Sequence, residues 1–390
     1  MMGREAEEPT EGTEAEGQEP WRPVWEDAAA EAMAMAPPSW LAPSRRWPEP
    51  DWRALTAPLA AAEDALSRLD AGAEAASPAL REGLVARMAF AEAAGWLASA
   101  ADRAWIHPRD LALAEAGLLG DFIAAALGGH ARTALPATAG ASGPGHAGAL
   151  LAAEADRLPD GAVLAQGLAL ARTLRRLARL TQRDPLTDPA ALLQPLAMEA
   201  GPLRLRPERL AAWRGAALDP AQPPLLAAAM AAAAWMTANA IEDEQPMPVQ
   251  ALLLAAAVAR RRGRLRAIPL PFWAMTGPGR AAALPLRDPA VWPAVFLDRV
   301  ALAARQGLAE LARLREAEAA ARQSVGMGRR GHLAAAAELV LRRPVVTARG
   351  LARQLGITPQ AALRLLKRLE AARVIRESTG RRSFRAYGIF

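Results

Sequence analysis

The sequence predicts an all-α protein with one small β hairpin close to its C-terminus. Three observations lead to this fold class. Hydrophobic residues make up 52% of the 390 residues but aromatic residues only 5%, with Ala supplying much of the apolar count. Apolar residues recur at helical spacing over most of the chain, and strand-like alternation follows only after Val374. We therefore expect helices that pack closely through small side chains.

The composition divides the chain into five segments. Residues 1–54 form an acidic tail rich in Pro and Gly. We expect this tail to be disordered, because it cannot bury enough apolar surface to offset the entropy lost on ordering. The other four segments are an N-terminal helical region (55–127), a Gly/Ala/Pro linker (128–149), a helical body (150–325) and a small C-terminal domain (326–390).

Apolar spacing places the main helices of the first four segments. It predicts helices that begin near Pro58, Leu80 and Asp110. The longest amphipathic stretch runs from Trp292 to Arg315, and we expect it to brace the body against the C-terminal domain.

An uncharged run from Pro220 to Ile241 raises the question of a membrane span. It is mostly Ala, which partitions weakly into lipid, and polar residues and prolines interrupt it. The run is therefore predicted to be a buried core helix, and no membrane partner is expected. Three tryptophans at apolar spacings are predicted core residues: Trp213, Trp235 and Trp273.

Five arginines between Arg260 and Arg266 end another predicted helix. Cations complement the dipole at a helix C-terminus, so the run is interpreted as a solvated helix end. If the body also contacts nucleic acid, this run is the candidate second contact.

A pair of short helices is predicted near the C-terminus. Thr347 is a suitable N-cap for the first helix, and Gly356 can adopt the positive φ that ends it. Thr358 followed by Pro359 is a strong start for the second helix, because the hydroxyl caps free N–H groups and Pro loses nothing at the first helical position. The second helix has an inward apolar stripe of Ala362, Leu365, Leu366 and Leu369.

The period becomes alternating after Val374, with a turn at Thr379 and Gly380 and a returning strand that contains Phe384 and Tyr387. Two helices followed by such a hairpin have the order of a winged helix with a two-stranded wing. The predicted fold class is thus an all-α body with a small C-terminal winged-helix domain.

The charge of this domain indicates nucleic acid as its partner. From Arg329 onward the chain has 14 Lys and Arg residues against three acids, a net charge of +11, while the whole chain carries only +6. A basic module on an acidic remainder is typical of phosphate binding, and we expect double-stranded DNA as the partner. A protein-interaction role for the winged helix is the alternative that stays open.

The outward face of the second helix supplies the candidate DNA-binding residues. Gln360 and Arg364 are predicted to reach base edges in the major groove, and Lys367 and Arg368 to bind phosphates. The complete predicted set is Thr358, Gln360, Ala361, Arg364, Lys367, Arg368 and the wing residues Arg381, Arg382 and Arg385. Because one winged helix reads few base pairs, we expect a homodimer on a two-fold site, with the body as the dimer contact.

The body resembles the N-terminal region of Fic-domain proteins. The resemblance is carried by the stretches LAAAEDALSRLD (59–70), FAEA (90–93) and HPRDLALAEAG (107–117), by the W-x3-FL pattern from Trp292 to Leu297, and by the terminal TGRRSFRAY wing. It is similar in layout to bacterial proteins in which a Fic-like helical body precedes a helix-turn-helix. The resemblance implies a Fic-like helical fold over about residues 55–390.

The catalytic motif of the Fic family is absent from the chain. That motif, HPFx[DE]GNGR, supplies a His base and a phosphate-binding loop, whereas none of the four His residues here precedes Phe. At the place in the chain order where the motif belongs, Glu242, Asp243 and Glu244 would repel phosphates. We therefore expect a catalytically inactive scaffold that uses no cofactor and binds no nucleotide.

Two other function classes remain as alternatives to a transcriptional regulator. One is a divergent Fic-type nucleotidyl (AMP) transferase with a rewired pocket, and the other is a non-catalytic adaptor that holds a partner protein. A metal site is not expected, because no ligand follows Glu242–Glu244 at suitable spacing. The absence of Cys excludes disulfides and fits a reducing cytoplasm, where we place the protein.

Overall fold

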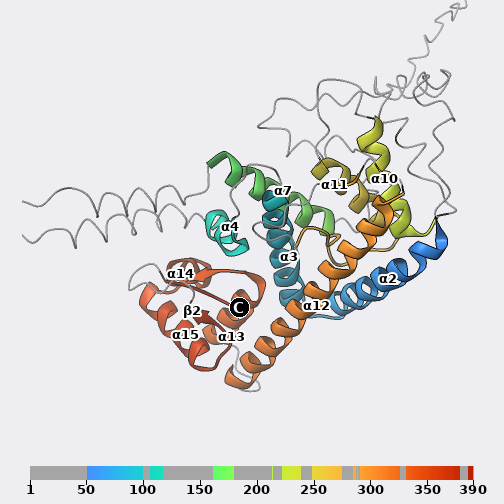
Figure 1. Ribbon diagram of the computed structural model, residues 1–390. Coiled ribbons are helices and arrows are strands. Elements are labelled where there is room, and N and C mark those ends of the chain that lie inside the picture. Colours follow the sequence, from blue (N-terminus) through green and yellow to red (C-terminus); the bar gives the residue numbers. More distant parts are fainter. Residues whose placement is uncertain are drawn as a thin grey trace, which may run out of the picture.

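The computed structural model describes most of the chain between residues 51 and 389 (Figure 1). The described residues are 51–99, 106–116, 161–179, 213, 222–238, 248–274, 284–286, 288, 290–325, 331–377 and 385–389. In this part of the chain the fold is helical apart from one small sheet near the C-terminus, which confirms the predicted class. The predicted linker and the acidic Glu242–Glu244 loop lie outside the described residues.

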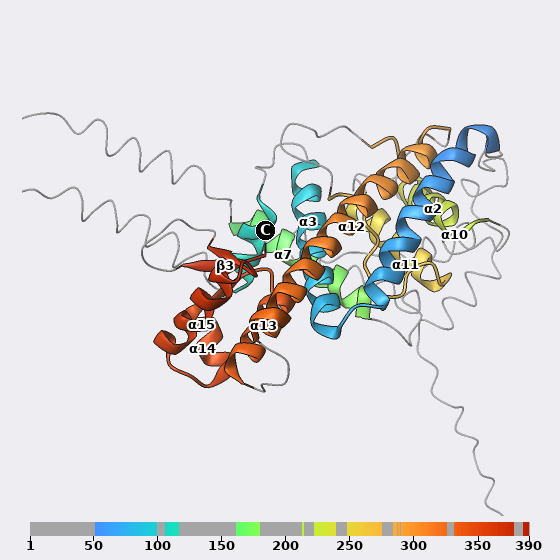
Figure 2. The same cartoon turned by 90° about the horizontal axis from the view of Figure 1, so that it is seen from below.

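Two long helices form one side of the body. Helix α2 (Trp52–Glu74) lies beside α12 (Trp292–Val325) along much of its length (Figures 1 and 2). Leu69 packs onto Gly307, and further along both helices the Ser77 hydroxyl donates to Glu318 at 2.7 Å, so the two helices run in the same direction. Helix α2 begins earlier than Pro58 because the Asp51 carboxylate caps it, accepting from Arg53 N at 3.0 Å.

Helix α3 (Pro78–Ser99) runs through the middle of the molecule. It packs against α4 (Pro108–Glu115), α7 (Gly161–Arg179), α12 and the first helix of the C-terminal domain. Its residues are buried on nearly all sides over the second half of the helix. This helix therefore connects the body to the C-terminal domain.

Helices α10 (Pro224–Ala238) and α11 (Pro248–Arg261) pack side by side in the core. Residues of α10 are buried around the whole circumference, as predicted for the uncharged run. Trp213, Trp235 and Trp273 are core residues, and the Trp213 indole N–H donates to the Ala231 carbonyl at 2.8 Å. None of the helices in the described part of the chain is long and apolar enough to cross a membrane.

The C-terminal domain is a winged helix. Its elements are α13 (His332–Arg342), β1 (Val346–Thr347), α14 (Ala348–Leu355), α15 (Pro359–Ala371), β2 (Arg376–Glu377) and β3 (Ala386–Gly388). The sheet has the order β1-β3-β2 and is antiparallel, with Val346 opposite Tyr387 and Glu377 opposite Tyr387 on the other side. The sequence predicts the two wing strands but misses β1, because two residues are too few to show alternation.

The arginine run at the end of α11 is not a solvated helix terminus. Arg260 is buried and donates to the carbonyls of Ala178 and Arg266, both at 2.9 Å. Arg262 donates to the Gln222 carbonyl at 2.7 Å, and Arg264 forms an ion pair with Glu63. The interpretation of these three arginines as a solvated end was wrong, because each one bonds α11 to another segment of the body.

Candidate nucleic-acid interface

The helix-turn-helix is built by local capping. The Thr347 hydroxyl accepts from Gly350 N at 3.1 Å and starts α14. Gly356 then ends α14 with φ of +64°, and Ile357 N donates back to the Ala352 carbonyl at 3.1 Å. Both predicted caps are confirmed, so the first helix and its turn are determined by these few residues.

Helix α15 begins as the sequence predicts. The Thr358 hydroxyl accepts from Ala361 N at 3.2 Å, and Pro359 is the first helical residue. Two of the predicted DNA-binding residues therefore also serve the cap, Thr358 through its hydroxyl and Ala361 through its amide.

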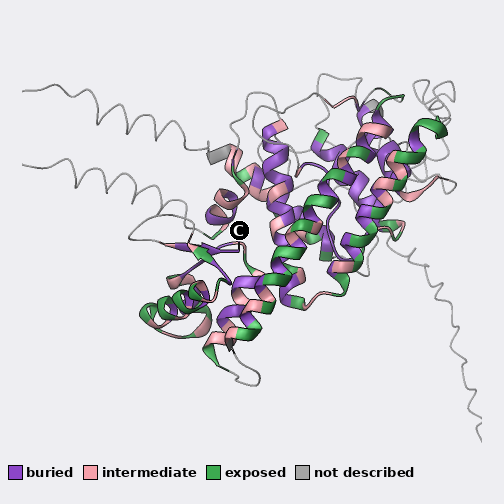
Figure 3. Cartoon of the chain, turned by 60° about the horizontal axis from the view of Figure 1, so that its bottom comes forward, coloured by how far each residue is buried: buried purple, intermediate pink, exposed green. Residues whose placement is uncertain are grey.

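The two faces of α15 differ sharply in burial. Ala362, Leu366 and Leu369 are fully buried, and Leu365 is partly buried against the same core. The opposite face contains Gln360, Arg364, Lys367 and Arg368, which are all exposed (Figure 3). Four of the predicted residues thus lie together on one solvent-facing side of one helix. Their roles on DNA stay a prediction.

An exposed leucine interrupts this polar face. Leu363 is 38% exposed and is one of few large apolar side chains with this exposure in the described part of the chain. Sequence analysis missed it because helical spacing alone places it at the edge of the inward stripe. An apolar side chain here has the chemistry to contact a thymine methyl group.

One of the cations on the face is partly neutralised. Lys367 Nζ lies 2.7 Å from Glu370 Oε2 and 5.9 Å from the centre of the Tyr387 ring. The hydrogen bond from Glu370 raises the pKa of Lys367, and the nearby charge of Arg385 opposes this rise. Lys367 therefore stays protonated, but a phosphate would have to share it with Glu370.

Helix α15 passes into β2 through a left-handed residue. Arg373 has φ of 59°, and the turn is closed by Val374 N donating to the Leu369 carbonyl at 2.9 Å. The Glu370 carboxylate also accepts from Glu377 N at 3.3 Å, so α15 is bonded directly to the wing strand. No Gly marks this turn, and for that reason the sequence analysis could not find it.

The wing residues are only partly described. Arg385 is half-buried and immediately precedes β3. Arg381, Arg382 and the predicted turn at Thr379 and Gly380 lie outside the described residues.

The exposed face of α15 is accessible because α13 stands between it and the body. Figures 1 and 2 show α15 on the outer side of the C-terminal domain, away from α3 and α12. At the contact with the body, a Cβ atom on Gly83 would lie 1.9 Å from the Leu341 carbonyl oxygen. Only glycine permits this approach of α3 to the end of α13.

Arg87 fixes the same contact. Its guanidinium donates to the carbonyls of Leu341 at 3.0 Å and Arg343 at 3.2 Å, and it pairs with Glu310 at 3.3 Å. Burial lowers the pKa of Arg87 to about 10, an effect that Glu310 opposes, so the side chain remains charged at neutral pH. A cation at the last carbonyls of α13 complements the helix dipole, and this contact attaches the domain firmly to the body.

Residues 333–390 match the sequence model of a family described as "HTH DNA binding domain". The matched segment begins inside α13 and includes both helices of the pair and the wing. No curated protein matches the chain. The match supports a DNA-binding protein, and it does not extend to the part of the chain that resembles Fic proteins.

Proposed function

We propose that the protein is a transcriptional regulator that places α15 in the major groove of duplex DNA. The observation that carries the proposal is the exposed cationic side of α15, in a winged helix within the matched DNA-binding segment. Gln360 and Arg364 have the amide and guanidinium groups that distinguish adenine and guanine at their major-groove edges. Arg368, Lys367 and the wing arginines would bind phosphates, with Leu363 in apolar contact with thymine methyl groups.

Fluorescence anisotropy with a labelled duplex of mixed sequence tests the proposal. The full chain should bind at low salt, and its affinity should fall steeply as salt rises, because binding to phosphates releases counterions. The triple variant Arg364→Ala, Lys367→Ala and Arg368→Ala should bind at least about 30-fold more weakly. The magnitude of its salt slope should decrease by about 1 for each phosphate that the variant no longer binds.

A matched triple variant separates this effect from bulk charge. Arg68→Ala, Arg305→Ala and Arg322→Ala remove the same charge from exposed positions on α2 and α12. This control should bind duplex DNA within about threefold of wild type, because long-range charge is screened at the salt of the assay. Equal losses in the two triple variants would show that α15 is not the DNA-contacting element.

We further propose that the body is a scaffold without Fic-type catalysis. The motif is missing from the sequence, and His107 serves as the N-cap of α4, with Nδ1 accepting from Arg109 N at 3.0 Å. Calorimetric titration of the full chain with ATP and Mg²⁺ should give no binding heat. A measurable ATP affinity would instead favour the divergent nucleotidyl transferase.

The regulator is proposed to act as a homodimer in the cytoplasm. A single α15 spans only a few base pairs, so a two-fold site read by two copies would supply the specificity that a promoter requires. Light scattering of the free protein should give twice the chain mass of 41.2 kDa. A monomer that also binds one duplex per chain would contradict this part of the proposal.

A further inference from the structure

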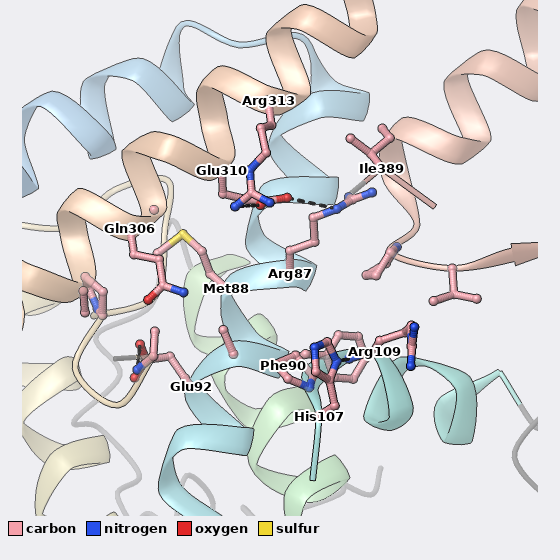
Figure 4. Close-up of a pocket in the computed structure, with 18 residues that line it drawn as sticks. Arg87, Met88, Phe90, Glu92, His107, Arg109, Gln306, Glu310, Arg313 and Ile389 are labelled. Carbon is pink, nitrogen blue, oxygen red and sulfur yellow. Dashed lines mark hydrogen bonds and ion pairs between the residues drawn. The ribbon is translucent and has the colours of Figure 1, made fainter. Parts of the chain in front are cut away.

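A cavity of about 270 Å³ lies where the body meets the winged helix (Figure 4). The body side is formed by α3, the start of α4, residues 271–274 and α12. The other side is formed by Pro344 and Val345, which lead directly into β1, and by Ile389, which directly follows β3. A molecule in this cavity would therefore contact both the body and the two ends of the winged-helix sheet.

The cavity combines an apolar surface with a small excess of positive charge. Met88, Phe90 and Pro271 are among the apolar lining residues, while Arg87, Arg109 and Arg313 bring three guanidinium groups to its edge. Two carboxylates, Glu92 and Glu310, also line it. Figure 4 shows Glu310 and Arg313 on one rim and His107 and Arg109 on the opposite rim, with open space between them.

Most of these charged groups already have structural tasks. Glu92 is 1% exposed and accepts from the amides of Phe272, Trp273 and Ala274, which fixes the loop at the cavity wall. Arg87 is committed to the carbonyls at the end of α13. Glu310 lies between Arg87 at 3.3 Å and Arg313 at 2.8 Å, so one carboxylate neutralises only one of two cations.

The cations at the two rims are therefore the groups that can meet a ligand. The side chain of Arg313 is 48% exposed and that of Arg109 is 36% exposed, whereas the side chain of Arg87 is only 9% exposed. A guanidinium carries five N–H donors in a fork that fits a carboxylate, so the pairs with Glu310 and Asp110 leave the geometry for a further anion. Apolar walls and a few convergent polar groups are typical of small-molecule sites.

We propose that this cavity binds a small organic monocarboxylate with an apolar body, and that its occupancy alters how the winged helix is held against the body. The carboxylate lies between Arg109 and Arg313, and the apolar part lies against Phe90, Met88 and Ile389. A ligand that bridges both sides adds contacts only when the domain is docked, so it stabilises the docked arrangement. Its effect on DNA affinity rests on the proposed regulator function, but ligand binding does not.

Ligand-detected saturation-transfer NMR on the full chain, without DNA, tests the site. Phenylacetate should show saturation transfer and its neutral isostere phenylacetamide should bind at least about tenfold more weakly, because the amide lacks the charge. The double variant Arg109→Gln and Arg313→Gln should lose the preference for phenylacetate. Arg68→Gln, which removes an exposed arginine of α2 outside the cavity, should keep it.

The position of the probe is checked independently of charge. Ala91 is half-buried and lines the cavity, so Ala91→Leu should fill part of the space and abolish phenylacetate binding while the melting temperature stays within a few degrees of wild type. No saturation transfer with wild type, equal binding of acid and amide, or undiminished binding by the variants would each overturn the site.

The coupling to the winged helix has its own readout. Hydrogen exchange at α13 and β1 should slow when phenylacetate is saturating, because the docked state is stabilised. Unchanged exchange would overturn the coupling even if the probe binds. Duplex affinity of the wild type should shift at least about threefold with phenylacetate, whereas a protein that binds the probe but no duplex would refute the regulator and leave the site intact.

Discussion

The arginines of the C-terminal domain and those of the body do different work with the same side chain. On α15, Arg364 and Arg368 are exposed, and this side of the helix faces away from the body. In the body, Arg87, Arg260 and Arg264 donate to carbonyl or carboxylate oxygens of other segments, and little of them reaches solvent. An arginine count therefore does not measure the DNA-binding surface. Burial and hydrogen-bond partners decide whether a guanidinium stabilises the fold or is available to a phosphate.

The contact between α3 and α13 should give the largest effect on stability. Gly83→Ala places a methyl group against the backbone oxygen of Leu341, which cannot rotate away as a side chain can. We expect a loss of about 3 kcal/mol or more in the free energy of unfolding, measured by urea denaturation, despite the better helix propensity of Ala.

Gly72→Ala on α2 is the matched control. There the new methyl group would meet only the Leu311 side chain, at 2.8 Å. Its stability should stay within about 1 kcal/mol of wild type, since the gain in helix propensity offsets a modest repacking. Comparable losses in the two variants would show that the tight approach to α13 is not special.

The buried carboxyl of Glu92 should make the body sensitive to pH. Desolvation raises the pKa of Glu92 to about 7, although the three amides that it accepts from favour the charged form. Between about pH 4.5 and 7 the folded state binds a proton that the unfolded chain releases, so this group makes stability fall as pH rises through that window. The decrease attributable to Glu92 is about 3 kcal/mol.

Glu92→Gln should flatten this part of the pH profile. The variant loses one hydrogen bond to the 272–274 amides, because an amide nitrogen cannot accept, and is less stable than wild type at pH 5. Urea denaturation from pH 4.5 to 7.5 measures both slopes. Parallel slopes in wild type and variant would assign the pH dependence to another group.

A cross-comparison of two arginines tests the contrast directly. Arg264→Gln removes the ion pair with Glu63 and the bond to its carbonyl at 2.7 Å, so it should cost about 2 kcal/mol of stability. Duplex affinity under native conditions should not change. Arg364→Gln should do the opposite, with stability within about 0.5 kcal/mol and duplex affinity reduced about tenfold.

Each variant is the control for the other, with denaturation and anisotropy as the paired measurements. The contrast between body and domain breaks down if Arg264→Gln weakens DNA binding as much as Arg364→Gln does.

The smallest effect is expected at the cap of α15. Thr358→Ala removes the acceptor for Ala361 N and should cost about 1 kcal/mol, whereas Thr358→Ser keeps the hydroxyl and should cost less than half of that. Thermal unfolding distinguishes them. Identical melting temperatures for the Ala and Ser variants would mean that the cap contributes little.

The winged helix could be predicted from sequence because its signals are local. Thr347, Gly356 and the Thr358-Pro359 pair each act within four residues of their position, and helical spacing identified the buried side of α15. The same local patterns predicted the all-α class and the buried α10. The exposed Leu363, the left-handed Arg373 and strand β1 escaped, because a single residue or a two-residue strand has no period to read.

Only the tertiary structure decided what the charges of the body do. Arg260 and Arg264 follow each other closely at a helix end, yet their partners, Ala178 and Glu63, lie far away in sequence. The Gly83 approach to Leu341, the Arg87 hydrogen bonds and the cavity at the domain junction likewise join segments about 180 to 310 residues apart in the chain. Sequence periodicity specifies which face of a helix is buried, but which other face it meets depends on packing of the whole chain, and the shared surface between body and winged helix arises only there.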